Sequence, residues 1–250
     1  MRRFFVDDIL EPQGSFAITG DEAKHITRVL RMRPGERIAL LDRGGARHQA
    51  LIKEVSRHHV LVDLEKLLPA PPPSPIHITL GQAVLKSNRM DFLVEKTSEL
   101  GVDRLLPFLS ERTVVKADGE NARAKVDHWQ DIARSAAKQS DRALPAQIGP
   151  LHSLDEMLAI LSKETALKIL LWEQEGIRSL RDVLRSSAPS PRVLALVGPE
   201  GGFTEKEVEK AGKAGFVSVS LGGRILRAET AAISLVTILQ YEWGDLSIRY

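Results

Sequence analysis

Two glycine-rich segments in the last quarter of the chain combine open backbone with charged side chains. The first, residues 196–204, reads LVGPEGGFT and follows an apolar, strand-like run. Its spacing matches neither the G-x-G-x-x-G turn of dinucleotide-binding folds nor the Gly-Lys-Ser/Thr of a P-loop. Glu200 stands where an anion would sit, and Pro199 removes one amide donor. The segment therefore favours a cationic or neutral ligand, such as a sulfonium, over a phosphate, with an ordinary glycine turn as the alternative.

The second segment, residues 221–232, reads LGGRILRAETAA and leads into an apolar helix predicted over Glu229–Trp243. Arg224 and Arg227 flank an apolar pair in a short loop. Glu229 and Thr230 stand at the predicted helix start, where acceptor side chains can satisfy free amides. These residues can serve a ligand site, or they can be an N-terminal helix charge beside solvated arginines.

Other candidate chemistry is weaker. Glu95 and Glu99 share one helix face, and we interpret them as a salt-bridged stripe because Lys96 and Arg104 are available partners. The histidines lack metal-ligand spacing, so no metal site is expected. The chain has no Gly-x-Ser-x-Gly elbow, which argues against a serine hydrolase.

The elements that must position these segments change character at a proline-rich stretch, residues 69–75, which we interpret as a stiff linker. Before it, short strands are predicted with one helix over Asp21–Leu30, which indicates a small β-rich barrel. The predicted strands are Ser15–Thr19, Glu36–Asp42, Ala50–Val55 and Val60–Leu64.

After the linker, strands and helices alternate, which predicts a mostly parallel sheet covered on both faces. The predicted strands are Ile76–Val84, Arg104–Leu109, Leu167–Trp172, Val193–Val197 and Phe216–Leu221. The other predicted helices are Met90–Leu100, His128–Lys138, Leu154–Ser162, Ser179–Leu184 and Thr204–Ala214, the last beginning with a capping box. Ligands of such sheets bind at the carboxyl ends of the strands, so the loops after Trp172, Val197 and Leu221 are the candidate site.

Composition sets wider limits. The 250 residues carry 35 Lys+Arg and 33 Asp+Glu, a formal charge of +2, which is too mild to identify a partner. No cysteine occurs, so disulfides and thiolate metal sites are excluded and a cytoplasmic location fits. We find no signal peptide and no apolar run long enough to span a membrane.

Taken together, these segments resemble the bacterial 16S ribosomal RNA uridine-N3 methyltransferases of the knotted SPOUT superfamily over nearly the whole chain. The order and spacing of the motifs carry the resemblance: HITRVLRMRPG at 25–35, KTSELGV at 96–102, SER at 110–112, AKQSDR at 137–142, GPEGGF at 198–203 and LGGRILRAETA at 221–231. Gly223 departs from the pattern, because many relatives are expected to have proline there, and this affects the stiffness of the loop.

The resemblance implies an α/β fold with two domains: a PUA-like RNA-binding barrel over 1–70 and a trefoil-knotted SPOUT methyltransferase domain over 76–250. It also implies a homodimer, S-adenosyl-L-methionine as cofactor, and as substrate 16S rRNA, within the assembled 30S subunit. The residues it implies for the cofactor are Leu171, Trp172, Glu173, Gly198, Glu200, Gly201, Leu221, Gly222, Ile225, Leu226, Thr230 and Ala231.

By the same resemblance, Arg227 is expected to stabilise the negative charge that develops on the uridine, with Glu229 as the other catalytic candidate. Glu229 and Glu200 are both candidates for the proton acceptor, and both can be purely structural. The residues expected to contact RNA are Arg2, Arg3, His25, Arg28, Arg31, Lys86, Arg89 and Arg142. Three alternatives remain: a knotted methyltransferase acting on another RNA such as transfer RNA or on a 2′-hydroxyl, a non-catalytic RNA-binding protein, and a nucleotide-phosphate enzyme, which Glu200 and Pro199 disfavour.

Overall fold

The computed structural model describes residues 1–69, 72–115 and 119–246. The chain divides into two compact units, residues 1–72 with 137–144 and residues 73–136 with 145–250. Ala70 and Pro71 of the predicted linker lie outside the described residues. The sequence assigns residues 137–144 to the second domain, whereas in the structure they pack with the first unit.

Unit 1 is built on a five-stranded sheet with the strand order β1-β3-β4-β5-β2. Only the β1–β3 pair is parallel. The strands are β1 Arg2–Phe5, β2 Gly14–Ile18, β3 Arg37–Leu41, β4 Arg47–Val55 and β5 Val60–Leu68. The four predicted strands are confirmed within a few residues. Strand β1 was not predicted, because its RRFF sequence has no apolar–polar alternation and its partner lies 36 residues further along the chain.

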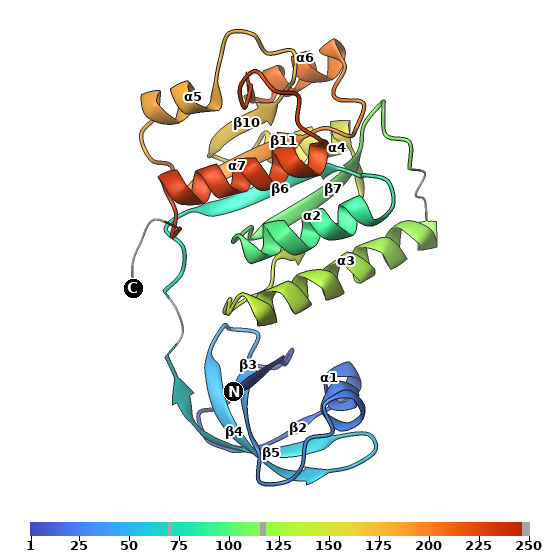
Figure 1. The fold of residues 1–250 in the computed structure, drawn as a ribbon, viewed down its shortest axis with the longest axis vertical. Coiled ribbons are helices and arrows are strands. Elements are labelled where there is room, and N and C mark those ends of the chain that lie inside the picture. The colour runs from blue at the N-terminus through green and yellow to red at the C-terminus, as the bar shows by residue number, and fades with distance from the viewer. Residues whose placement is uncertain (70–71, 116–118, 247–250) are drawn as a thin grey trace. The chain divides into compact units, whose positions relative to one another are not determined.

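The predicted helix over Asp21–Leu30 is present as two consecutive helical segments, of which Figure 1 labels the first, α1. Helix α1, Gly20–Lys24, continues into a π-helical turn, His25–Val29, in which the Leu30 amide donates to the His25 carbonyl at 2.9 Å. The buried side chains of Ala23 and Ile26 join this helix to the core of the sheet. Such π-helical turns often occur at functional sites, and this one carries two of the candidate RNA contacts, His25 and Arg28.

Residues 137–144 are fixed to unit 1 by charged groups. Asp141 forms ion pairs with Arg3, Nε to Oδ1 at 2.9 Å, and with Arg47, Nη2 to Oδ1 at 2.6 Å. Lys138 pairs with Glu22, and its carbonyl accepts a hydrogen bond from Arg3 Nη1 at 3.0 Å. Ala137 also joins a small buried cluster in this unit. The segment is therefore an integral part of unit 1, although it lies far from the rest of that unit in sequence.

Unit 2 is an α/β layer structure around a parallel sheet with the order β12-β10-β11-β6-β7-β8, and β9 also pairs with β7. The strands are β6 His77–Ala83, β7 Arg104–Leu109, β8 Gln147–Ile148, β9 His152–Ser153, β10 Leu167–Leu171, β11 Arg192–Val197 and β12 Val217–Val219. The helices are α2 Asn88–Glu99, α3 Gly119–Gln139, α4 Leu154–Leu161, α5 Leu180–Ser186, α6 Glu205–Lys213 and α7 Ala228–Glu242, and the part of α3 from residue 137 onward belongs to unit 1.

Both faces of this sheet are covered, as the sequence predicts. Along β11, Val193, Ala195 and Val197 join the core that is shared with α2, α5 and α7. Leu194 and Leu196 point to the opposite core, which is shared with α4 and α6. Figure 1 shows α2 and α7 side by side over the first of these faces.

The remaining predictions for unit 2 are confirmed within a few residues, except that α3 begins nine residues before the predicted start at His128. The Thr204 capping box is present: its side chain accepts from the Glu207 amide, and the Glu207 carboxylate accepts from the Thr204 amide at 2.9 Å. The two-residue strands β8 and β9 were not predicted, because they are too short to show a period. The trefoil knot stays a prediction, since strand order alone does not fix how a chain threads.

Candidate functional site

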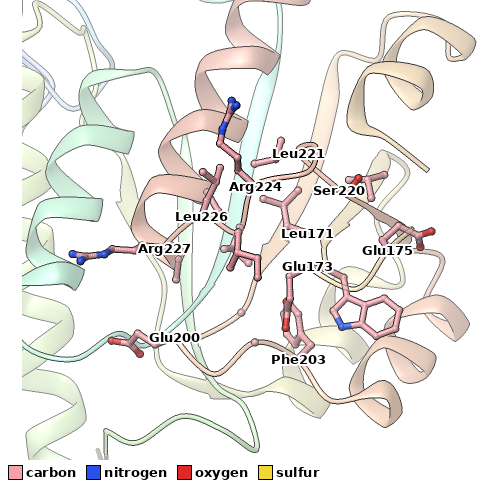
Figure 2. A pocket seen from close by; sticks show the side chains of 18 of the residues that line it. Leu171, Glu173, Glu175, Glu200, Phe203, Ser220, Leu221, Arg224, Leu226 and Arg227 are labelled. Atoms are coloured by element: carbon pink, nitrogen blue, oxygen red, sulfur yellow. The ribbon is translucent and has the colours of Figure 1, made fainter. Parts of the chain in front are cut away.

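The candidate site lies where three neighbouring parallel strands end. In the sheet, Leu171 at the end of β10 is in register with Val197 at the end of β11 and with Val219 at the end of β12. The three loops that follow therefore leave the same edge of the sheet side by side. They enclose a cavity of about 880 Å³ (Figure 2).

The cavity brings together most of the residues predicted for the cofactor. The predicted residues that line it are Leu171, Trp172, Glu173, Gly198, Glu200, Gly201, Leu221, Gly222, Ile225, Leu226 and Ala231. Thr230 is exposed in the first turn of α7 and is not part of the lining. Leu171 and Leu226 provide part of an apolar wall, whereas Ile225 is 88% exposed and lies at the rim.

The loop after β11 has a conformation that requires glycine. Gly202 has φ +68°, and a Cβ atom there would lie 2.1 Å from Glu173 Oε1. A Cβ on Gly198 would lie 3.2 Å from the ring of Phe203, which is 1% exposed and stacks on Phe108. Gly202 thus lets this loop approach the loop after β10, Gly198 leaves room for the ring of Phe203, and the buried Phe203 anchors the loop to the sheet.

Several polar groups of the cavity have defined partners. Glu200 accepts from the Lys86 amide at 3.1 Å and faces Arg89 Nη1 at 3.4 Å. Glu175 accepts from the Ser218 hydroxyl and from the amides of residues 177 and 178, and the Ser218 hydrogen bond is the main cause that lowers the pKa of this carboxyl. Trp172 differs, because its buried indole Nε1 has no hydrogen-bond partner among the described residues.

The two predicted catalytic residues occupy different positions. Arg227 is the N-cap residue of α7 and lines the cavity, and Figure 2 shows its guanidinium extending away from Leu171 and Leu221. Within the described parts of the chain, Arg227 has no carboxylate at ion-pair distance. Glu229 is only 8% exposed, lies behind the lining, and is 3.9 Å from Arg89 Nε.

The predicted RNA contacts are divided between the two units. Arg2, Arg28 and Arg31 are exposed on unit 1, and Lys86 is exposed on unit 2. His25 is half-buried, with its ring edge against Phe4. Arg3 forms an ion pair with Asp141, and Arg89 forms ion pairs with Glu200 and Glu229. Arg142 was expected on the larger domain, but it belongs to the segment that packs with unit 1.

The salt-bridged stripe on the helix that carries Glu95 and Glu99 is present in the structure. Lys96 Nζ lies 2.7 Å from Glu95 and 3.0 Å from Glu99, which confirms the salt-bridged stripe, although Arg104 pairs with Glu164 instead. In the described ranges, we find no acidic, histidine or cysteine cluster that could hold a metal ion. Over the same ranges, no helix has the length and hydropathy needed to cross a bilayer.

Sequence reasoning missed several lining residues, among them Phe203, Val219, Ser220 and Glu175. Phe203 follows the glycine pair directly, so its burial beneath the turn could have been expected. Arg89 was assigned to RNA, and nothing local in the sequence indicates that it reaches two carboxylates that are distant in sequence, one in the loop after β11 and one in α7.

Comparisons with known proteins agree with this geometry. A family described as RNA methyltransferase domain matches residues 72–240, and one described as RNA methyltransferase PUA domain matches residues 18–65. The chain is 31% identical over 248 residues to ribosomal RNA small subunit methyltransferase E of Bacillus subtilis, covering 97% of each chain.

Two solved structures are similar over almost the whole chain. Ribosomal RNA small subunit methyltransferase E from Neisseria gonorrhoeae, bound to S-adenosyl methionine, has a TM-score of 0.89 at 35% identity and covers 98% of this chain and 99% of its own. A putative methyltransferase from Legionella pneumophila, in complex with the same cofactor, has a TM-score of 0.90 at 31% identity and covers 98% of each chain.

Proposed function

The chain belongs to the family of ribosomal RNA small subunit methyltransferase E, and we propose that it uses S-adenosylmethionine to methylate N3 of one uridine in 16S rRNA. The observation that carries this proposal is the cavity at the three strand ends that are in register. Parallel α/β sheets bind their ligands at this edge.

The residues around the cavity fit S-adenosylmethionine. Its volume of about 880 Å³ is within the range that accommodates a molecule of this size. The carboxylate of Glu173 favours a cationic ligand, and the leucines of the wall suit an adenine ring. The unpaired Nε1 of Trp172 is a buried donor that a ligand acceptor can satisfy. When bound, the cofactor supplies a methyl carbon on a sulfonium, and its sulfur becomes neutral as that carbon is transferred.

The protein's own task is then to make N3 of uridine reactive. N3 carries a proton at neutral pH, and loss of that proton places negative charge on the two flanking carbonyl oxygens. A fixed cation stabilises this charge, and we assign that role to Arg227, which lines the cavity and has no carboxylate partner among the described residues. N3 is also on the Watson–Crick edge, so the base must be unpaired or flipped to react.

Glu229, the second predicted catalytic residue, is better suited to an indirect role. It is buried behind the lining, and its ion pair is with Arg89. Glu200 is held by the Lys86 amide and by Arg89. We therefore assign both carboxylates an indirect role, in which they hold Arg89 rather than contact the base. The acceptor of the N3 proton is left unassigned.

We assign RNA binding to the basic residues of both units. The exposed Arg2, Arg28, Arg31 and Lys86 are available to phosphates, which position an RNA without reading its sequence. His25, Arg3, Arg89 and Arg142 belong to the same predicted set. Arg3 must exchange its carboxylate for a phosphate, whereas Arg89 keeps both carboxylates and offers a phosphate the nitrogen that they leave, Nη2. Because the net charge is only +2, a folded 30S subunit in the cytoplasm is a better substrate than a short oligonucleotide.

We further propose a homodimer that uses the outer face of α7. Tyr241 is 64% exposed and Ile238 is 38% exposed on this helix, and Phe92 of the neighbouring α2 is 48% exposed. Ile238 and Tyr241 are three residues apart on α7 and therefore share one helix face, and an exposed apolar face is typical of a protein interface. Sedimentation analysis tests this: a dimer is expected, and its loss is expected in the variant Tyr241→Glu.

The function is tested by offering the protein labelled S-adenosylmethionine with 30S subunits from cells that lack this gene, or with transfer RNA. Label on the 30S subunit alone is the expected result. Label on transfer RNA alone overturns the substrate and retains the cofactor. No transfer to either RNA, with calorimetry showing no binding of S-adenosylmethionine, favours the non-catalytic RNA-binding alternative; binding of ATP in its place favours a nucleotide-phosphate enzyme.

A further inference from the structure

Arg89, at the start of α2, lies between two carboxylates that come from different segments of unit 2, one in the cavity lining and one buried next to it. Its Nη1 is 3.4 Å from Glu200 Oε1, in the loop after β11. Its Nε is 3.9 Å from Glu229 Oε1, in the first turn of α7. Arg89 itself lines the cavity, and 45% of its side chain is exposed. One guanidinium therefore joins two segments that are separate in sequence.

The two carboxylates differ in how much they depend on Arg89. Glu200 also accepts from the Lys86 amide at 3.1 Å, so part of its charge is compensated by backbone. Glu229 is 8% exposed, and its Oε2 is buried without a hydrogen-bond partner. Arg89 is the cation at ion-pair distance from Glu229 among the described residues. A buried carboxylate that loses its counter-ion must find another cation or become neutral.

The nearest alternative by chain position is Arg227, two residues before Glu229 and at the same helix start. Arg227 has no carboxylate partner in the described part of the chain, and we assign to it the stabilisation of the negative charge that develops on the base. If Glu229 or Glu200 captured this guanidinium, it would be withdrawn from the base.

We propose that Arg89 is a positioning residue: as the shared counter-ion of Glu200 and Glu229, it keeps Arg227 available to the substrate. This inference rests on the proposed function, because the role of Arg227 does. It also accounts for arginine at this position. A guanidinium offers separate nitrogens to the two carboxylates, here Nη1 and Nε, whereas a lysine ammonium is a single point charge.

The test compares Arg89→Gln, Arg89→Lys and the double variant Arg89→Gln/Glu229→Gln with the wild type. Methylation of 30S subunits gives kcat and KM, and calorimetry gives the Kd of S-adenosylmethionine. Arg123→Gln, on an exposed face of α3, is the matched control for removal of one cation. We expect Arg89→Gln to lower kcat by about 10- to 100-fold, less than the roughly 10²–10³-fold for direct loss of a group that stabilises the transition state, because Arg227 itself is retained. The Kd is expected to change by less than about threefold, because one of many cavity contacts is altered.

The double variant separates a counter-ion from a merely structural contact. Removing the charge of residue 229 leaves less negative charge to capture Arg227, so the double variant is expected to recover at least about fivefold in kcat over Arg89→Gln. Arg89→Lys is expected to lie between Arg89→Gln and the wild type. Wild-type kcat in Arg89→Gln, or a double variant no better than the single one, overturns the inference.

Failure of the proposed function gives a different result. If neither the wild type nor Arg123→Gln methylates 30S subunits, the assignment of the reaction is wrong. The pairing of residues 89 and 229 is then still tested by thermal unfolding, because the inference requires Glu229→Gln to raise the Tm of the Arg89→Gln protein. The single variant Glu229→Gln completes this cycle, and Tm changes of the two single variants that add up to that of the double variant overturn the pairing itself, independently of activity.

Discussion

The substitution Gly202→Ala tests whether the turn after β11 shapes the cofactor site. Gly202 has φ +68°, a left-handed conformation that costs a residue with a Cβ about 1–2 kcal/mol. The added Cβ would also lie 2.1 Å from Glu173 Oε1, so either the turn or the carboxylate must move. Both responses change the wall of the cavity.

The size of the effect follows from the cost of placing an alanine in the left-handed backbone conformation of residue 202. If the turn of the free variant moves out of the strained conformation, and S-adenosylmethionine binds only the wild-type conformation, then binding must restore the strain. The free energy of binding is then less favourable by the whole of that cost. At about 1.4 kcal/mol for each factor of ten, about 1–2 kcal/mol corresponds to a rise in Kd of about 5- to 30-fold. Displacement of Glu173 from the wall adds to this rise.

Titration calorimetry with S-adenosylmethionine measures the Kd, and Gly215→Ala is the matched control. Gly215 has φ +90° but lies after α6, outside the cavity lining, and the methyl group of an alanine there would make only ordinary contacts with Lys168. We expect the control to lose stability, with a Tm lower by about 2–8 °C, and to keep the wild-type Kd. A folded Gly202→Ala protein with unchanged Kd would refute the reasoning.

Three further changes have defined outcomes. Arg227→Gln should lower kcat by about 10²–10³-fold with little change in the Kd of the cofactor, and a change in KM alone, in steady-state kinetics, would contradict this. Asp141→Ala leaves two arginines of unit 1 unpaired and should cost about 1–3 kcal/mol in denaturant unfolding; an unchanged midpoint argues against its role. Ser218→Ala should raise the pKa of Glu175 toward its ordinary value in an NMR titration. Because folding lowers the pKa of Glu175, this carboxylate stabilises the fold above its unfolded-state pKa, and the stabilisation is lost as pH falls through its native pKa. The higher native pKa in Ser218→Ala should therefore move this loss of stability to higher pH.

The sequence predicts the strands around the site well, because β10 and β11 are short apolar runs, followed by charged residues after β10 and by Gly198 and Pro199 after β11. The glycine-rich loops are also predictable, since the positive φ of Gly202 and Gly222 needs glycine. Strands β1, β8 and β9 were not predicted, because they are short and are defined by pairing with distant strands rather than by their own pattern.

Long-range charge pairing explains the other differences. Arg89 has the sequence context of an ordinary basic residue before a helix, and only the fold brings it to Glu200, 111 residues further along the chain. Asp141 likewise lies 94 residues from Arg47 in sequence, so the packing of residues 137–144 with unit 1 has no local signal. Periodicity reports which face of an element is buried, but it does not report which distant charges meet.

The central claim is that the methyl group is transferred to N3 of one uridine in 16S rRNA. We would methylate 30S subunits from cells that lack this gene, digest the 16S rRNA to nucleosides and identify the product by mass spectrometry. The account predicts 3-methyluridine from a single position, with product reduced in Arg227→Gln. Methylation of a 2′-hydroxyl, or of a base other than uridine, would contradict the role given to Arg227, since no charge would then develop on the carbonyl oxygens that flank N3.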